Sequence, residues 1–217
     1  MMIYLAGLVG FLLVLTAQAG VGPTGPKSLC DESEECLQFE TICKNEDYEV
    51  RRYAPVKWVC TSFSSLNWAF GIAPAFWRLK TYLDDNNIGM KTAPGIMAMP
   101  ADDPPPSDGD WLSALNNIPK RLSKTYSICF LPSSEHQSNP PKPADPKVTI
   151  KSEGVRYMYV RGYKGWIKDD TAQANLLFSS LNMASYEKSH YAVGYNSPMS
   201  KSPYGEVWVE TDDKAHC

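Results

Sequence analysis

Tyr-Glu-Val-Arg-Arg-Tyr-Ala-Pro-Val-Lys-Trp, at residues 48–58, is echoed later in the chain by Val-Arg-Gly-Tyr-Lys-Gly-Trp at residues 160–166. Each phrase precedes a helix-like stretch, and each helix-like stretch precedes a turn that ends in proline, at Pro94 and at Pro198. A doubled unit of this kind predicts two half-domains packed about a pseudo-twofold axis. The seam between such halves is a natural place for a ligand pocket.

The residues around the two phrases predict the same order of elements in each half. Strand-like runs occupy 48–53, 56–63, 91–99 and 125–131 in the first half, and 148–151, 157–163, 191–195 and 206–210 in the second. We expect 48–53 and 56–63 to form a hairpin. The fold class predicted is α+β: a pseudo-twofold repeat of β-β-α-β-β halves forming a distorted mixed-sheet barrel with two helices.

Helical spacing of apolar residues predicts the two helices. The first apolar stripe is Ile72, Phe76, Leu79 and Leu83, and the second is Ala174, Leu177, Leu181 and Ala184. Proline is tolerated best in the first turn of a helix, so we expect the first helix to begin near Pro74. Asp169, Asp170 and Thr171 offer caps for the second helix.

The N-terminal residues 1–19 form an apolar run without a charged side chain, closing on Ala17-Gln18-Ala19. This small-residue pattern after a short apolar core predicts a cleaved secretory signal peptide. A signal anchor is the alternative, but a transmembrane helix needs about 20 apolar residues. No other apolar run is long enough to span a bilayer, so the sequence predicts a secreted, extracellular protein with no membrane span.

Six cysteines follow the expected cleavage site: Cys30, Cys36, Cys43, Cys60, Cys129 and Cys217. An even number in an oxidising compartment predicts disulfide bonds, and the spacings do not suit a zinc site. The first three cysteines lie in an N-terminal extension, residues 20–45, which is polar and expected to be irregular. Disulfides formed by these cysteines would hold the extension in place, and Cys217 is a further candidate partner for one of them. Cys60 and Cys129 lie in strand-like runs and could pair across the domain, although the connectivity as a whole stays open.

The net charge and the absence of catalytic motifs argue against two classes of function, nucleic-acid binding and catalysis. The net charge is −3, and no basic stripe interleaved with aromatic residues is present, so nucleic acid is not an expected partner. No Ser-His-Asp arrangement, glycine-rich phosphate loop or metal-ligand cluster can be assembled, so we do not expect an enzyme. Tyr195 and Glu206 are interpreted as structural hydrogen-bonding groups.

Five motifs in order resemble the SOUL family of haem-binding proteins. They are Tyr48–Tyr53 with Trp58, Lys91–Pro94, Pro140-Pro141-x-Pro143, Gly194–Pro198 and Glu206–Trp208. The resemblance covers roughly residues 45–210. It implies two pseudo-symmetric halves of βαββ type, and binding of haem or a related tetrapyrrole without chemistry on it. The expected division is therefore 1–19 signal peptide, 20–45 extension, 46–211 SOUL-like haem-binding domain and 212–217 C-terminal tail.

The resemblance also implies where haem would bind: a shallow apolar cleft near the first helix, with basic side chains on the propionates. The candidates for the apolar slot are Phe76, Leu79, Leu83, Met97 and Met99, and those for the propionates are Arg78, Lys80 and Lys201. The alternatives are a plain core face and solvated surface charges. Thr81 and Ala73 stand where one family member has a lysine and an arginine.

The axial ligand of the iron has few candidates. Of the histidines His136, His190 and His216, only His190 precedes a strand, and a structural hydrogen bond is its alternative role. Met97 is a further candidate ligand. We expect weak apolar association without a strong axial ligand, in an extracellular carrier or scavenger. The alternatives are a secreted protein-interaction module, a general apolar-ligand carrier without haem, and a small-molecule hydrolase; no protein partner is identified.

Overall fold

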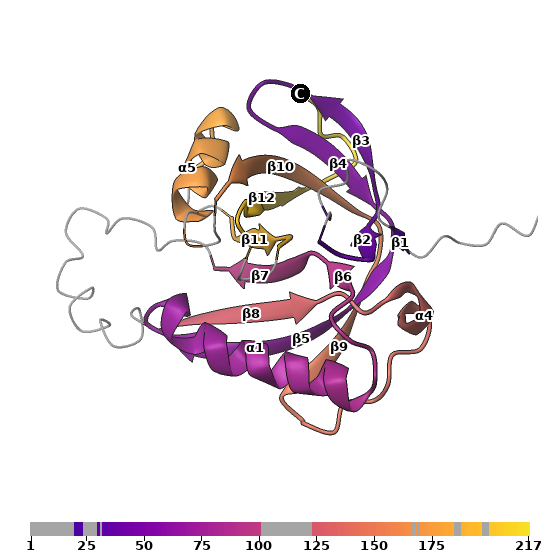
Figure 1. Ribbon diagram of the computed structural model, residues 1–217. Helices are drawn as coiled ribbons and strands as arrows, with labels where there is room; N and C mark the ends of the chain where they lie inside the picture. The colour runs from indigo at the N-terminus through magenta and orange to yellow at the C-terminus, as the bar shows by residue number, and fades with distance from the viewer. Residues whose placement is uncertain are drawn as a thin grey trace, which may run out of the picture.

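A curled antiparallel sheet with helices packed on it forms the body of the protein (Figure 1). This computed structural model describes residues 20–23, 30, 32–100, 123–165, 168, 170–184, 188–196 and 200–217, so the expected signal peptide, 1–19, lies outside the described residues. The strands are β1 (Val21–Pro23), β2 (Glu35–Leu37), β3 (Phe39–Lys44), β4 (Glu49–Tyr53), β5 (Val56–Ser65), β6 (Thr92–Ala93), β7 (Gly95–Met99), β8 (Lys124–Phe130), β9 (Val148–Glu153), β10 (Arg156–Lys164), β11 (His190–Gly194) and β12 (Tyr204–Thr211). The helices are α1 (Trp68–Asp85), α4 (Ser134–Gln137) and α5 (Asp170–Ser180).

The sheet has a symmetric strand order, β3-β4-β10-β12-β11-β7-β8-β5-β9. One half of the chain supplies β4-β5-α1-β7-β8 and the other supplies β9-β10-α5-β11-β12. The halves meet where β7 pairs with β11, and each half lends its first strand to the other, because β4 pairs with β10 and β9 with β5. The predicted α+β fold with a pseudo-twofold repeat is confirmed. The parallel pairing implied by a mixed sheet occurs between β2 and β6, in a separate three-stranded sheet with β1.

The expected hairpin between 48–53 and 56–63 is wrong. Strand β4 pairs with β3 and β10, whereas β5 pairs with β8 and β9. Only Ala54 and Pro55 separate the two strands, a spacing that favours a tight turn. A residue before proline is driven to extended backbone, however, so the chain runs on into the other half of the sheet instead of turning back.

The two echoed phrases do not occupy equivalent places in the repeat, which corrects the first expectation. Residues 48–58 cover β4 and the start of β5, whereas the described part of the echo, residues 160–165, covers the end of β10. By strand order β4 corresponds to β9, and β10 corresponds to β5. The phrases instead mark neighbouring strands, with Val160 opposite Glu49. The twofold was predicted correctly from the order of elements, not from this likeness.

Helix α1 begins earlier than predicted. Its cap is Asn67, whose side-chain oxygen accepts a hydrogen bond from the Ala69 N–H at 2.9 Å, and Pro74 lies inside the helix. The start is set by the capping side chain, which satisfies an N–H that the first turn leaves unpaired. Pro74 is tolerated because it is exposed, so water can reach the carbonyl group that loses its helical partner.

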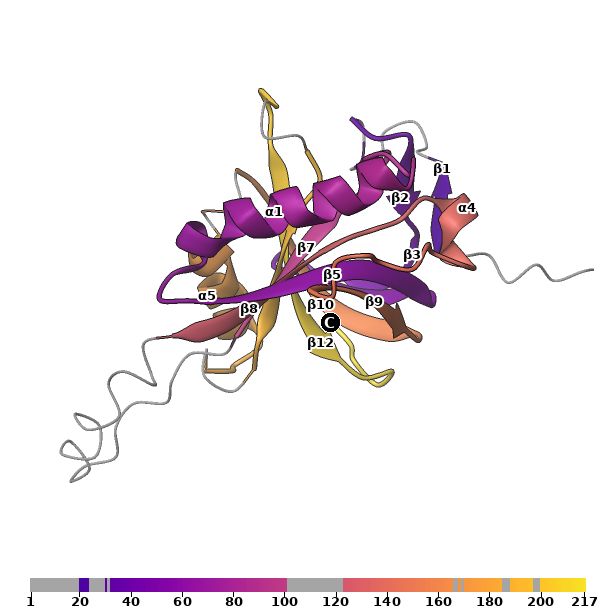
Figure 2. The same cartoon turned by 90° about the horizontal axis from the view of Figure 1, so that it is seen from below.

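The helices pack at opposite ends of the sheet. The buried face of α1, made by Ala75, Leu79, Tyr82 and Leu83, packs with Val59, Ile128 and Phe130 of β5 and β8. Helix α5 packs Ala174, Leu177 and Phe178 against Val207 and Val209 of β12. Figure 2 shows α1 running along β5 and β8. No helix among the described residues is long and apolar enough to cross a membrane.

The third helix, α4, was not predicted and lies in the connection between β8 and β9. Its buried Gln137 pairs with the backbone of β5 beyond the end of β8: Nε2 donates to the carbonyl oxygens of Lys57 and Pro132, and Oε1 accepts the Lys57 N–H at 2.8 Å. A single glutamine amide therefore satisfies three backbone groups.

The N-terminal extension is strand-forming where an irregular arm was expected. Strand β3 pairs with β4 at the edge of the main sheet, and β2 pairs with β6. Three disulfides hold the chain: Cys30–Cys36, Cys43–Cys217 and Cys60–Cys129. The candidate pairing of Cys60 with Cys129, and the role of Cys217 as a partner of the extension, are confirmed.

Candidate functional site

A cleft of about 520 Å³ lies between α1 and the ends of β6, β7, β8, β11 and β12. Its apolar walls include Phe76, Leu83, Ile96, Met97, Ile128 and Phe130. Small-molecule sites typically enclose about 300–1,000 Å³ and are lined mainly by apolar side chains with a few polar groups. The cleft therefore has the size and the lining of a site for an apolar ligand.

The cleft reaches the seam between the two halves. Gly95 of β7 lies opposite Gly194 of β11, and both line the cleft. A Cβ atom on Gly194 would meet nothing within 4 Å, so the bare backbone there leaves open space. On the α1 side, the ring of Phe76 packs edge-on against Phe130, with 5.4 Å between ring centroids. The seam thus contributes room, and the helix contributes the aromatic wall.

The apolar residues predicted for the slot divide between the cleft and the core. Phe76, Leu83 and Met97 line the cleft. Leu79 is fully buried and does not line it; its side chain packs in the core between α1 and β5. Met99 lines a different cleft, described below.

The predicted cations lie outside the cleft lining. Arg78 is engaged in the protein, with Nε 3.3 Å from Asp145 Oδ2 and Nη1 donating to Thr61 Oγ1 at 2.9 Å. Lys80 pairs with Asp84 one turn further along α1, and Lys201 is exposed. None of these three cations belongs to the described lining of the cleft, and the propionate clamp stays a prediction.

The candidate axial histidine is bound to a carboxylate. His190 Nε2 lies 3.1 Å from Oδ2 of the fully buried Asp170, and its ring packs edge-on against Phe178. It lines a second cleft of about 190 Å³, next to Trp68 and Tyr126, and not the larger one. His136 bonds Ser133. No group of three or more His, Cys, Asp or Glu side chains that could hold a metal ion occurs among the described residues.

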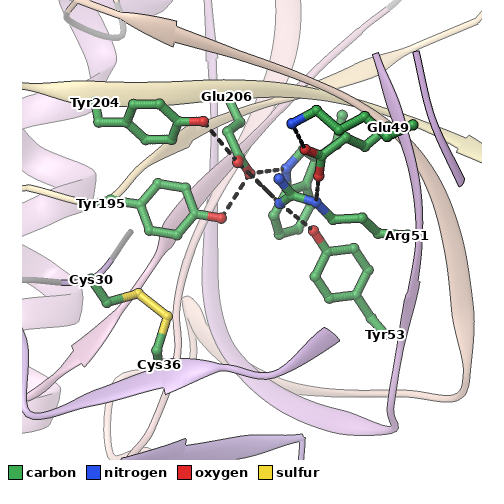
Figure 3. Close-up of polar contacts among 10 residues, drawn as sticks. Cys30, Cys36, Glu49, Arg51, Tyr53, Tyr195, Tyr204 and Glu206 are labelled. Carbon is green, nitrogen blue, oxygen red and sulfur yellow. Dashed lines mark hydrogen bonds and ion pairs between the residues drawn. A yellow bond between two sulfur atoms is a disulfide. The ribbon is translucent and has the colours of Figure 1, made fainter. Parts of the chain in front are cut away.

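Behind the cleft wall lies a buried charge cluster that sequence reasoning largely missed (Figure 3). Glu206 of β12 is fully buried, and its Oε2 accepts hydrogen bonds from Tyr195 Oη and Trp208 Nε1, both at 2.7 Å. Its Oε1 lies 3.0 Å from Arg51 Nη1 and 3.4 Å from Tyr204 Oη. Since Tyr195 and Tyr204 also line the cleft, the cluster forms the support of that wall. The interpretation of Tyr195 and Glu206 as hydrogen-bonding partners is consistent with this geometry.

Arg51 balances the charge of Glu206. Its Nε donates to Glu49 at 2.7 Å, Glu49 in turn accepts from Lys44, and the guanidinium lies 4.0 Å from the ring centroid of Phe39. Burial is the largest single influence and would lower the pKa of Arg51, but the attraction of Glu206, together with the smaller contributions of Tyr53 and Tyr195, outweighs it and raises that pKa. Burial likewise opposes ionisation of Glu49, yet the hydrogen bonds from Lys44 and Arg51 lower its pKa. Arg51 and Glu49 therefore both stay charged at neutral pH.

A signal for this cluster does exist in the sequence. Strand residues two apart share a face, so Glu206 must face the same way as Trp208, and Arg51 the same way as Tyr53. An inward-facing acid on one strand and an inward-facing arginine on another predict a buried pair only if the two strands are known to be close. That knowledge required the β4–β10–β12 order.

The buried tyrosines predict a loss of stability at alkaline pH. Burial, and after it the negative charge of Glu206, raises the pKa of Tyr53, Tyr195 and Tyr204. A raised folded-state pKa contributes stability that is complete below the unfolded value near pH 10 and is lost above it, because the unfolded chain then releases protons that the folded chain keeps.

For Tyr53 and Tyr195, both fully enclosed, the free energy of unfolding should fall by up to about 3 kcal/mol per pH unit above about pH 10. Urea unfolding at a series of pH values, together with phenolate absorbance, measures this slope. Tyr53→Phe should make the slope shallower. A flat profile across this range would contradict the prediction.

Similarity to known proteins spans most of the chain. Residues 34–210 match the family described as SOUL heme-binding protein. Heme-binding protein 2 of Homo sapiens is 30% identical over 173 residues, which cover 75% of this chain and 77% of that protein. The Mus musculus protein of the same name is 28% identical over 172 residues with the same coverage. Among solved structures, that of SAV2435 bound to tetraphenylphosphonium covers 77% of this chain and 94% of its own, with 11% identity and a TM-score of 0.45.

Proposed function

The chain belongs to the SOUL family of heme-binding proteins, and from this premise we propose that it binds haem or a related tetrapyrrole in the 520 Å³ cleft and carries it outside the cell. The observation that carries the proposal is the apolar cleft at the seam of the two halves, within the span that matches the family. A macrocycle is a large apolar plate, and its burial against aromatic and aliphatic walls supplies most of the binding energy.

Phe76, Leu83 and Met97 are the proposed contacts of the macrocycle. Phe76 is half-buried and presents an aromatic face, whereas Leu83 and Met97 are buried and form the base of the cleft. Within the described lining the potential iron ligands are the thioethers of Met90 and Met97 and the phenols of Tyr195 and Tyr204, which donate to Glu206, and no histidine is present. This favours association through apolar contact, without a strong axial ligand.

The extracellular location is supported by the cysteines. All six are paired, one pair within the extension and the other two across long separations of 174 and 69 residues. Disulfides of this kind persist in oxidising compartments and are rare in the cytosol. A carrier role accords with the site, because the polar groups around the cleft are engaged in structural hydrogen bonds.

A hemin titration of the purified, disulfide-bonded protein tests the proposal. We expect a saturable shift of the Soret band. Phe76→Ala should weaken binding about tenfold or more, since burial of a phenylalanine side chain is worth about 1.5–3 kcal/mol. Phe70→Ala is the matched control: it removes another aromatic side chain of α1, which is 79% exposed and does not line the cleft.

The possible outcomes test separately the identity of the ligand, the position of the site and the contacts to the propionates. Absence of a saturable shift would remove haem as the ligand. Equal losses in the Phe76 and Phe70 variants would place the ligand elsewhere. The combined Arg78→Ala, Lys80→Ala and Lys201→Ala variant tests the predicted propionate clamp, which requires a clear loss of hemin affinity but little loss for a neutral apolar dye.

A general apolar-ligand carrier is the second candidate, because Glu32 is the only cleft-lining residue with a formal charge at neutral pH among the described residues. A cleft without cations gives no direct partner to the propionates of haem. Iron-free protoporphyrin IX and the neutral dye Nile red distinguish the candidates. Equal affinity for all three ligands would favour the general carrier over a haem protein.

A further inference from the structure

One wall of the cleft comes from the N-terminal extension. Glu32 and Ser33 line the cleft, and both precede residue 34, where the match to the family begins. The family-matched fold therefore supplies most of the cleft, and a short segment in front of that match supplies the remaining wall.

A disulfide brackets this wall. Cys30 and Cys36 are bonded to each other, and both are buried in the same core cluster as Tyr195 (Figure 3). Between them the Ser33 N–H donates to the Cys30 carbonyl oxygen at 3.0 Å, which closes a turn. The cross-link limits the conformations of the intervening segment, because its two ends cannot separate.

The wall is also attached to the rim of the cleft. Strand β2 pairs in parallel with β6, and the N–H groups of Glu34 and Glu35 both donate to the Lys91 carbonyl oxygen, at 2.9 and 3.1 Å. Thr92 and Ala93 of β6 line the cleft themselves. On its other side, Glu35 accepts the Ser134 N–H at 2.7 Å, which ties the segment to α4. The residues next to Glu32 and Ser33 thus have fixed partners on two sides.

We propose that this disulfide-bracketed segment, Cys30 with residues 32–36, is a retaining wall that slows the escape of a ligand from the cleft. The proposal rests on ligand binding in this cleft, as set out above. A ligand that is enclosed on one more side keeps more of its contacts when it moves within the cleft. A wall that is held in place also blocks one direction of exit, so the ligand dissociates more slowly. Cutting the disulfide leaves the lining residues Phe76, Met97 and Phe130 in place but removes the covalent restraint on the wall.

The test compares two double variants that each remove one disulfide. Cys30→Ser with Cys36→Ser frees the wall; Cys43→Ser with Cys217→Ser frees β3 from the C-terminal end, away from the cleft lining. The measured quantity is the dissociation rate of hemin, followed by its transfer to excess apomyoglobin, and of Nile red, followed by fluorescence after dilution. We expect dissociation about tenfold faster from the first variant and changed less than about threefold in the second, since such differences act mainly on dissociation.

A third variant, Glu32→Gly with Ser33→Gly, keeps all three disulfides and trims only the wall, so it covers the case in which the first variant does not fold. It should also release ligand faster. Unchanged dissociation rates in this variant would contradict the proposal that the segment slows ligand escape. Equal acceleration of dissociation in both disulfide variants would contradict it as well. If Nile red dissociates faster from the Cys30/Cys36 variant than from the Cys43/Cys217 variant while hemin does not bind, the haem proposal fails and the retaining-wall proposal is supported. If the wild-type protein binds neither probe, the cleft is not a ligand site and the wall proposal falls with it.

Discussion

Arg51→Leu should lower the free energy of unfolding by about 3–5 kcal/mol, the typical cost of removing one partner from a buried ion pair. Glu206 is fully buried, and Arg51 is the cation that contacts its carboxylate among the described residues. Leucine would leave that carboxylate with hydroxyl and indole donors only, so a charge would stay buried without compensation. Urea unfolding at neutral pH measures the change.

Arg52→Leu is the matched control for this result. Arg52 is the next residue of β4, lies partly exposed, and has Glu40 as its partner at 3.8 Å. Exposed pairs of this kind contribute about 0–1 kcal/mol. The double variant Arg51→Leu with Glu206→Gln should recover much of the loss, because both charges are then absent and an amide oxygen can still accept from Tyr195 and Trp208. A loss in Arg51→Leu no larger than that in Arg52→Leu would contradict the role assigned to this pair.

Leu79→Ala should destabilise the protein by about 2–5 kcal/mol, the range for truncating a fully buried leucine and leaving a cavity. Leu79 was a candidate for the haem slot, yet its side chain is 0% exposed and is absent from the cleft lining. The folded variant should therefore bind hemin with nearly the affinity of the wild-type protein. Denaturant unfolding and a Soret titration at low temperature measure the two effects separately.

Leu66→Ala is the control, because this leucine is 66% exposed and its loss should change stability by no more than about 0.5 kcal/mol. Leu79→Ala would contradict the structural assignment if it kept its stability but lost hemin affinity. Such a result would put Leu79 in the site and not in the core between α1 and β5.

The candidate site was only partly predictable from the sequence. An apolar stripe at helical spacing identifies a buried helix face, but Phe76, Leu79 and Leu83 belong to one stripe and meet different surroundings. A difference of one turn decides whether such a residue faces the cleft or the sheet. The predicted cations show the same limit of local sequence patterns. Arg78 forms an ion pair with Asp145, a residue far away in the chain, which its own helix does not predict.

What the residues determine without any tertiary information is local: the strands of the two repeated halves, the two main helices, the doubled order of elements and the motifs of the SOUL family. Periodicity and capping act over a few residues, so they can be interpreted directly. Tertiary structure decided the exchange of β4 and β9 between the halves and the burial of Glu206 beside Arg51. It also placed Glu32 in the same cleft lining as the seam glycines. These depend on which distant strands become neighbours, and that choice minimises exposed apolar surface and unpaired backbone over the whole sheet, a quantity that no short stretch of sequence contains.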